Sequence, residues 1–516
     1  MKKIMILALK GVGLCLGLVV LVFFAGVYWP MDRVDPNPRP ERLLLQGVNL
    51  VDVRTGGLLT SHSILVEDGV ITAIGAGLPS EGATVVDASG RYAIPGLFDM
   101  HVHTMKAAPD LMHPLFIASG VTAVRDMGGC IGLDDAWVAC AEDKRAWTEA
   151  VDIGNHVGPR YDQVTSLAVN GGNELPDGVP AELNGATAEG ARARVAFDKA
   201  RGIDFLKTYS TLPREGYFAL AEEAAKAGMY PAGHLPFTVS ASEAVASGQR
   251  SIEHAFLFIW DCYPGMQDLR DKGRFGAVFA PELRTKMIAE HDEAACEVLY
   301  GKMAEAGVAF VPTHTTRKLD AYAGDDAYRT DERLKYIQRP LRALWLDDAQ
   351  GMAAQAGDAN AQGYKDIFEF GIELTGRAHR RGVDVLVGTD APDSFAFPGL
   401  GMRDEFEHLS KAGLSPLEVL QSATLKPARF LGLEGRAGEL RIGARADIVL
   451  LGNNPLADVA AISDVDGVVL AGAYYDRKDL DQMLEAVENN AGSWASWPKF
   501  VWQILHSPIM LKKVGG

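Results

Sequence analysis

The sequence is poor in cysteine and contains no cysteine motif for metal binding. Only five of its 516 residues are cysteine. Four of them, Cys130, Cys140, Cys262 and Cys296, lie beyond the N-terminal segment, and none has CxxC or CxH spacing. A metal site built on cysteine thiolates is therefore not expected.

The sequence also lacks a basic block, an internal repeat and a low-complexity tract. Acidic residues outnumber basic ones by 67 to 50, which gives a formal net charge of −17. A nucleic-acid-binding surface needs clustered lysine and arginine, so no nucleic-acid partner is expected. With 48% hydrophobic and 23% charged residues, the composition is that of an ordinary globular protein with a large core.

A long uncharged apolar run lies near the start of the chain. Residues 11–29 carry no charge and are numerous enough to cross the hydrocarbon core of a bilayer. Lys2, Lys3 and Lys10 precede the run, which places the N-terminus in the cytoplasm and the rest on the periplasmic or extracellular side. Residues 1–29 therefore predict a signal anchor or, alternatively, a cleaved signal peptide. Export would permit disulfides, and the four cysteines then allow three pairings.

Beyond the apolar run, the pattern of the sequence changes from strands to a strand–helix alternation and back. Residues 43–92 and 434–476 contain short alternating runs broken by Gly, Asp and Ser, typical of antiparallel strands. Between them, residues 93–433 alternate apolar strands with helical segments eight times, which predicts an α/β fold, a parallel (β/α)8 TIM barrel. Both flanks would then form a small β-sandwich domain. The remaining parts are a Pro-rich linker at 30–42, helical insertions at about 261–307 and 317–371, and a helical, aromatic tail at 477–516 that either packs on the body or lies at a membrane interface.

Polar side chains end several of the predicted barrel strands. Asp99, His101 and His103 alternate along the first strand and therefore point to one face. Active groups of barrel enzymes lie at the carboxyl ends of the strands, where the loops open. Imidazole nitrogens and carboxylate oxygens suit zinc and similar divalent ions. We therefore predict a metal site from six residues at strand ends: His101, His103, Lys207, His234, His254 and Asp390.

With these residues, the sequence resembles the amidohydrolase superfamily, especially its imidazolonepropionase-like and prolidase-like members. The resemblance spans roughly residues 43–476 and rests on DGVITAIG…VVDASGRYAIPGLFDMHVH, on VGTDAP, and on ATLKPARFLGL…GELRIGARADIVLLGNNPL. It implies a metal-dependent hydrolase that cleaves a C–N amide bond by attack of a metal-bound hydroxide. The implied substrates are dipeptides or N-acyl amino acids.

The resemblance also implies a role for each strand-end residue. The two histidines of the HVH motif and Asp390 would bind the more buried of two divalent ions, with zinc the expected metal, and His234 and His254 would bind the second. Lys207 falls where binuclear members have a lysine carboxylated by CO₂, whose carbamate bridges both ions; a lysine beside a single metal is the alternative. Asp390 would also act as general base and then as general acid.

Other residues are expected to contact the substrate or support the site. Tyr209 faces the same side as Lys207 and resembles a tyrosine of prolidase-like members that contacts the scissile carbonyl. His314, at the end of the seventh strand, is expected to bind substrate or to stabilise the tetrahedral oxygen. Asp99 either orients a ligand histidine or caps backbone. Arg125 either pairs with a substrate carboxylate or, as we favour, forms a salt bridge inside the barrel.

One departure from the family pattern leaves the substrate open. Relatives often have TGGH after the third strand, where this chain has NGGN at residues 170–173. Asparagine in place of that histidine changes the charge and hydrogen bonding of the pocket, which puts a prolidase-like specificity in doubt. Two alternatives therefore stay open: a mononuclear cyclic-amide hydrolase resembling imidazolonepropionase, and a catalytically inactive, membrane-tethered binding protein. The chain could also form a homo-oligomer.

Overall fold

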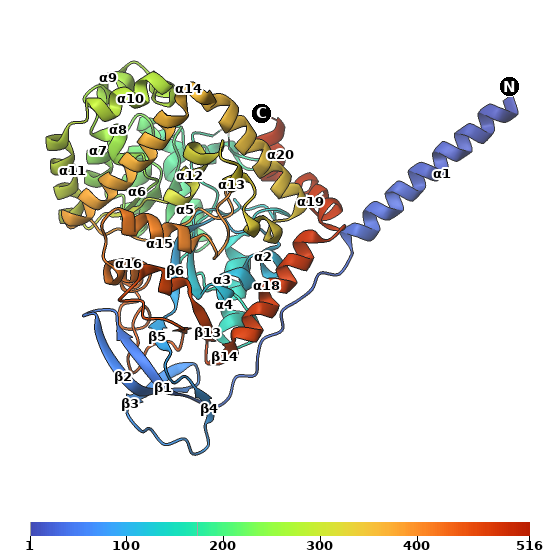
Figure 1. Cartoon of the computed structure of the whole chain (residues 1–516). Helices are drawn as coiled ribbons and strands as arrows, with labels where there is room; N and C mark the ends of the chain where they lie inside the picture. The colour runs from blue at the N-terminus through green and yellow to red at the C-terminus, as the bar shows by residue number, and fades with distance from the viewer. Residues whose placement is uncertain (1, 173, 516) are drawn as a thin grey trace.

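The computed structural model of the chain describes residues 2–172 and 174–515. It contains a long N-terminal helix, a β-sheet and a body in which strands and helices alternate (Figure 1). The helix α1 (Lys2–Val27) extends away from the body, and the strands β1 to β4 lie on the far side of the body from its free end.

The eight strands of the sheet come from both flanks of the body. Hydrogen bonds join them in the order β14-β13-β12-β5-β1-β2-β3, with β4 paired to β1. The single path of pairings links the early strands to the late ones through β5 and β12, which are antiparallel. The strands are β1 (Arg42–Asp52), β2 (Gly57–Glu67), β3 (Val70–Gly75), β4 (Thr84–Asp87), β5 (Tyr92–Pro95), β12 (Ile448–Leu451), β13 (Val465–Leu470) and β14 (Ala473–Asp476).

The strand β12 shows how the sheet attaches to the body. All four of its residues are buried, since successive side chains point to opposite faces and both faces are covered. Ile448 and Leu450 pack in the apolar cluster of the sheet itself. Val449 and Leu451 belong instead to the large core that continues into the body. Two apolar layers therefore share one strand, which fixes the sheet against the body.

The strands of the body pair in parallel around a ring. The pairs are β6 (Leu97–Val102) with β7 (Val121–Asp126), and then β8 (Leu206–Thr208), β9 (Pro231–Gly233), β10 (Ser251–Glu253) and β11 (Ala309–Val311) in sequence. Parallel bridges complete the ring: Ala123–Arg160, Val169–Thr208, Phe310–Val385 and Val102–Ala391. The third and eighth predicted strands thus close the ring through isolated bridges, and the order is the one expected of a (β/α)8 barrel.

Helices surround this ring and fill both predicted insertions. The helix α14 carries a kink at Gly357, whose φ of 57° is non-helical. The helices are α2 (Ala108–Leu111), α3 (His113–Ala118), α4 (Ala141–Asp152), α5 (Ala188–Ala200), α6 (Arg214–Lys226), α7 (Ala241–Ala246), α8 (Leu257–Asp261), α9 (Met266–Asp271), α10 (Pro281–Ala289), α11 (Glu293–Ala306), α12 (His314–Tyr322), α13 (Asp326–Arg329), α14 (Arg339–Arg380), α15 (Met402–Lys411), α16 (Pro416–Ser422), α17 (Leu425–Phe430), α18 (Arg477–Gly492), α19 (Ser496–Leu505) and α20 (Pro508–Gly515).

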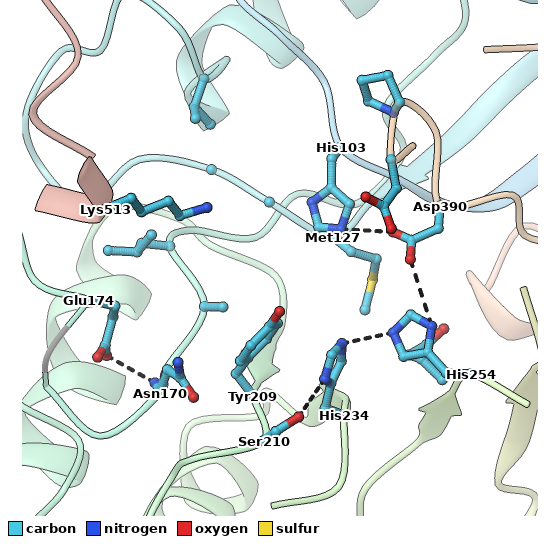
Figure 2. Close-up of a pocket in the computed structure, with 18 of the residues that line it drawn as sticks. His103, Met127, Asn170, Glu174, Tyr209, Ser210, His234, His254, Asp390 and Lys513 are labelled. Carbon is cyan, nitrogen blue, oxygen red and sulfur yellow. Dashed lines mark hydrogen bonds and ion pairs between the residues drawn. The ribbon is translucent and has the colours of Figure 1, made fainter. Parts of the chain in front are cut away.

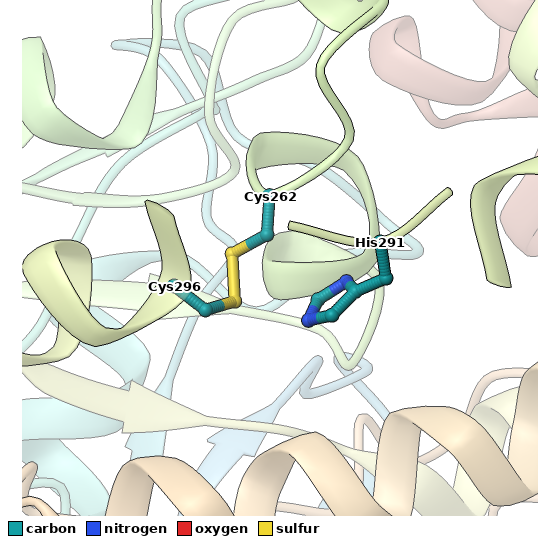
Figure 3. Close-up of side chains that lie close together, drawn as sticks. All are labelled: Cys262, His291 and Cys296. Carbon is teal, nitrogen blue, oxygen red and sulfur yellow. A yellow bond between two sulfur atoms is a disulfide. The ribbon is translucent and has the colours of Figure 1, made fainter. Parts of the chain in front are cut away.

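The cysteines adopt one of the three pairings that the sequence left open. Disulfides join Cys130 to Cys140 and Cys262 to Cys296. His291 lies beside the second disulfide, but its two sulfurs are bonded to each other and leave no thiolate for a metal (Figure 3). Cys15, on the exposed helix α1, is free.

The helix α1 has the length and composition of a membrane span. Its segment Leu9–Val27 has a mean hydropathy of 2.3, and only 6% of it is buried. A core helix of a soluble protein would be mostly buried, so most of the apolar surface of α1 is exposed among the described residues. The length and composition also suit a signal sequence.

Candidate metal centre

The carboxyl ends of the barrel strands bring the six predicted metal ligands together. A cavity of about 650 Å³ opens at this end, and four of the six line it: His103, His234, His254 and Asp390 (Figure 2). The other two, His101 and Lys207, lie beneath them with fully buried side chains. His101 lies on β6 and Lys207 on β8, whereas the others lie just after β6, β9 and β10 and at the end of the eighth strand segment.

His101, His103 and Asp390 form the first group of donors. The Nε2 atoms of His101 and His103 lie 3.2 Å and 3.1 Å from Oδ1 of Asp390. All three ligand atoms lie within 4.8 Å of one another. Although burial alone would raise it, the two histidines hold the pKa of Asp390 well below its usual range. An anionic oxygen between two imidazole nitrogens is a donor set that fits a divalent cation.

His234 and His254 form the second group. Their Nε2 atoms lie 2.7 Å apart. Each Nδ1 has its own hydroxyl partner at 2.8 Å, Oγ of Ser210 for His234 and Oγ1 of Thr313 for His254. Burial lowers the pKa of both rings, so both are neutral and each Nε2 can present a lone pair. Two lone pairs turned toward one another suit a shared cation, and Asp390 Oδ2 lies 3.7 Å from His254 Nδ1.

Lys207 lies next to His101 of the first group, with a buried side chain. Its Nζ is 3.3 Å from Nε2 of His101. Burial, together with the nearby charge of Arg125, lowers the pKa of Lys207 to about 8, which raises the fraction of neutral, nucleophilic amine. Gly233 makes room for this side chain, because a Cβ at Gly233 would lie 2.6 Å from Cδ of Lys207 and the glycine has a φ of 120°. The residues present therefore fit a lysine carboxylated between two divalent ions.

The buried carboxylate of Glu253 orients the ring of His101. Its Oε2 lies 3.0 Å from Nδ1 of His101, which leaves Nε2 facing Asp390. Its Oε1 accepts hydrogen bonds from Arg125 at 2.9 Å and from Ser251 at 2.5 Å. Although burial would raise it, Arg125 and His101 hold the pKa of Glu253 at about 2. Arg125 is thus bound inside the barrel, as favoured from the sequence. Glu253 itself was missed, although an acid in the apolar strand SIEHAF was a usable signal.

Asp99 caps backbone instead of orienting a ligand ring. Its carboxylate accepts hydrogen bonds from the backbone N–H of His101 at 3.2 Å and of Thr389 at 3.0 Å. It also accepts one from Oγ1 of Thr389 at 2.6 Å. Asp99 therefore joins β6 to the segment that carries Asp390. Its position is structural, and burial raises its pKa to about 6.

Three residues of the site have a left-handed backbone without being glycine. The φ angles are 75° for His254, 45° for Thr313 and 64° for Asp390. Such conformations are unfavourable for residues with a Cβ and persist only where the surrounding structure holds them. The barrel thus maintains a strained backbone at two of the predicted ligands and at one ligand's hydrogen-bond partner.

The structure brings Tyr209 to the cavity but places His314 elsewhere. The ring of Tyr209 stacks on His234 with centroids 4.1 Å apart, and it lines the cavity. His314 begins α12 and is fully buried, with Nε2 3.0 Å from Oγ1 of Thr375. Because the chain turns at Thr313, the side chain of His314 points into the packing between α12 and α14 and does not line the cavity. Asn173 falls outside the described residues.

The outer wall of the cavity is apolar and carries two cations that sequence reasoning missed. Arg317 on α12 lies over the ring of Phe256, 5.4 Å from its centroid, and Lys513 comes from the C-terminal helix α20. Lys513 is remote in sequence from the strand-end motifs, whereas Arg317 follows the predicted residue His314 by three positions. Apolar lining residues include Met105, Trp137, Leu257, Trp260, Phe279, Leu341, Ile509 and Met510.

Comparisons with known proteins agree with this architecture. A profile of the amidohydrolase family matches residues 345–474. A dihydroorotase from Trichlorobacter lovleyi is 42% identical over 82 residues, 16% of this chain and 19% of that protein, so the chain spans less than a fifth of its length. A 5'-deoxyadenosine deaminase from Methanosarcina acetivorans is 24% identical over 428 residues, covering 77% of this chain and 80% of that protein.

Solved structures share the fold at low sequence identity. A bottromycin amidohydrolase has a TM-score of 0.67 at 23% identity, covering 89% of this chain and 92% of that chain. A putative prolidase from Bifidobacterium longum has a TM-score of 0.58 at 23% identity, covering 87% of this chain and 100% of that chain.

Fold and site together define an α/β-barrel protein with a candidate centre for divalent metal ions at the carboxyl ends of its strands. The chain matches the amidohydrolase family model over residues 345–474 and shares its fold with solved amidohydrolase structures. The resemblance read from the sequence is thereby confirmed.

Proposed function

We propose that the chain is a metal-dependent hydrolase that cleaves a C–N amide bond in dipeptides or N-acyl amino acids. The observation that carries the proposal is the convergence of six donors, distant in sequence, at one cavity. Two divalent ions, with zinc expected, would be held by His101, His103, His234, His254, Asp390 and a carboxylated Lys207. When bound, such ions activate water and polarise a carbonyl.

Asp390 moves the proton in this proposal. Its carboxylate lies within reach of both histidine groups and at the floor of the cavity. A carboxylate at this position can accept a proton from the attacking water and deliver it to the leaving nitrogen. Tyr209 lies on the cavity wall beside His234, where its hydroxyl can donate to the oxygen of the scissile carbonyl.

Arg317 and the apolar wall favour a substrate that has a carboxylate and an apolar part. Dipeptides and N-acyl amino acids both carry a carboxylate next to the amide that is cleaved, and a guanidinium pairs with a carboxylate in a fixed geometry. Arg317 has only one ion-pair partner among the described residues, Asp320 at 3.4 Å, and its side chain is partly exposed to the cavity. A structural neighbour, a Xaa-Pro dipeptidase with bound methionine, supports this class of ligand.

The proposed location is the outer side of a cytoplasmic membrane, with α1 as the anchor. Support comes from the exposed apolar surface of α1 and from the two disulfides, which form in oxidising compartments. The lysines before the apolar run set the orientation.

The test is metal analysis of the purified full-length protein, followed by a screen of dipeptides and N-acyl amino acids. The proposal expects two ions per chain and hydrolysis of at least one member of these libraries. A matched control is the double variant H101A/H103A, which should lose both properties. One ion per chain with cyclic-amide hydrolysis would favour the imidazolonepropionase-like alternative. No ion and no hydrolysis after addition of zinc and bicarbonate would overturn the proposal in favour of a binding protein.

A further inference from the structure

Large apolar side chains are exposed where the N-terminal helix meets the C-terminal tail. We call this surface the junction patch and define it by Tyr28, Trp29, Trp494, Trp497, Val501 and Leu505. Their exposed fractions range from 38% to 76%. A cluster of such size on a folded chain marks an interaction surface.

The helix α19 presents its part of the patch as one stripe. Trp497, Val501 and Leu505 follow each other at intervals of four residues, so they lie on the same helix face. A different side of α19 packs on the body, where the ring of Phe500 lies 5.2 Å from that of Trp137. The exposed stripe is therefore turned away from the protein.

The patch is continuous with the end of the apolar helix α1. The rings of Trp29 and Trp494 lie 5.3 Å apart, and those of Phe24 and Trp502 lie 5.9 Å apart. Nζ of Lys499 donates a hydrogen bond of 2.9 Å to the carbonyl of Val27, the last residue of α1. Figure 1 shows α19 beside this end of α1. The apolar span and the stripe thus form one connected surface.

We propose that the junction patch lies in the interface of a lipid bilayer, with α19 flat on the membrane surface next to the point where α1 enters. Three tryptophans and a tyrosine at the end of an apolar helix match the aromatic belt that membrane proteins place at the headgroup level. An apolar stripe on a short helix with a lysine beside it is the composition of an interfacial helix.

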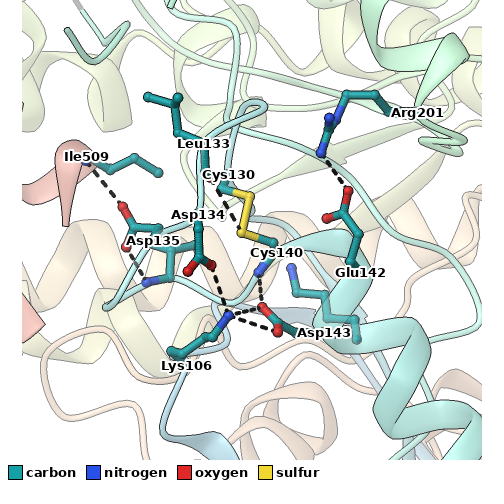
Figure 4. The surroundings of a disulfide bond; sticks show 12 residues. Lys106, Cys130, Leu133, Asp134, Asp135, Cys140, Glu142, Asp143, Arg201 and Ile509 are labelled. Carbon is teal, nitrogen blue, oxygen red and sulfur yellow. Dashed lines mark hydrogen bonds and ion pairs between the residues drawn. A yellow bond between two sulfur atoms is a disulfide. The ribbon is translucent and has the colours of Figure 1, made fainter. Parts of the chain in front are cut away.

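The same tail also forms part of the cavity wall. Oγ of Ser507 donates a hydrogen bond of 2.8 Å to Asp135, in the loop that the Cys130–Cys140 disulfide closes. Ile509 packs on that disulfide. Figure 4 shows Ile509 beside Asp135. Met510, in the same helix α20, lines the cavity. The rim of the cavity would therefore lie close to the membrane surface.

The experiment uses the full-length protein reconstituted into vesicles of brominated phosphatidylcholine, which quenches tryptophans near the bilayer. Replacing Trp494 and Trp497 by phenylalanine should reduce the quenched signal by about two thirds, because these are two of the three tryptophans of the junction patch. The control W147F, on α4 away from the patch, should leave the lipid-quenched signal unchanged. Equal quenching in W494F/W497F and the wild type would overturn the proposal.

A second pair of variants tests the stripe without removing a tryptophan. V501D/L505D should lower the quenching of the remaining patch tryptophans, since two carboxylates oppose burial in the interface. The control V298D also places a charge at an exposed apolar residue, on α11, and should have no effect. Unchanged quenching in V501D/L505D would contradict the proposal. A different outcome would be patch tryptophans that are not quenched and a dimer that V501D/L505D dissociates. That result would show that the patch binds a second copy of the chain instead of the bilayer.

Discussion

The floor and the rim of the cavity are built by different physical means. The floor residues His101, Lys207 and Glu253 lie on barrel strands, are fully buried, and have polar partners at about 3 Å. Residues of the rim, such as Arg317 and Met510, come from helices and keep part of their surface free. In the proposed function, the buried floor carries out the bond cleavage and the partly exposed rim selects the substrate.

The largest expected effect separates chemistry from metal binding at the floor. The variant D390N should lower kcat by about 10³-fold, because an amide cannot accept the proton that the carboxylate accepts. It should keep most of the bound metal, since five other donors remain. Steady-state kinetics and metal analysis on the same sample measure both. Loss of all metal in D390N would refute a separate role in proton transfer.

The next prediction concerns the buried lysine next to His101. The variant K207M keeps a similar volume but has no amine to carboxylate. We expect it to hold one divalent ion per chain instead of two and to lose about 10²-fold in activity. The exposed lysine in K199M, on α5, serves as the control. Two tightly bound ions in K207M would show that no carbamate bridge is needed.

The third prediction compares the two carboxylates that surround His101. The variant E253Q should weaken metal binding by about 10- to 100-fold, because the carboxylate that orients the ring is lost. The variant D99N should change metal affinity less, since Asp99 binds backbone N–H groups and a hydroxyl. Titration of the metal-free proteins with zinc measures both affinities. The reverse order of effects would exchange the roles of these two residues.

The smallest effect is expected at the rim. The variant R317Q should raise KM by about tenfold with little change in kcat, because a substrate carboxylate loses its charged partner. An exposed arginine of α15 provides the control variant R403Q. An equal rise in KM for an amide substrate that has no carboxylate would contradict this role of Arg317.

The sequence predicted the floor far better than the rim. Strand alternation and the position of polar residues at strand ends sufficed for His101, Lys207 and Asp390, because parallel strands of a barrel bring their carboxyl ends to one place. His314 satisfied the same pattern, yet the turn at Thr313 directs its side chain into the packing of α12 and α14. A local pattern does not reveal such a change of direction.

The rim could not be predicted because it depends on contacts between distant segments. Ile509 and Met510 line the cavity from a segment that Ser507 links to Asp135, 372 residues earlier in the chain. For the same reason, the sequence does not decide whether the tail lies at the membrane or packs on the body. Glu253 differs from these residues, because it is an acidic residue within an apolar strand of the sequence. Its ion-pair partner Arg125 is also a strand residue.

The measurement that tests the central claim most directly is anomalous X-ray diffraction from crystals of the zinc-loaded protein. The account predicts two peaks per chain at this end of the barrel, with His101, His103 and Asp390 coordinating one ion and His234 and His254 the other. Peaks elsewhere, or side chains too far from the ions for coordination, would contradict it.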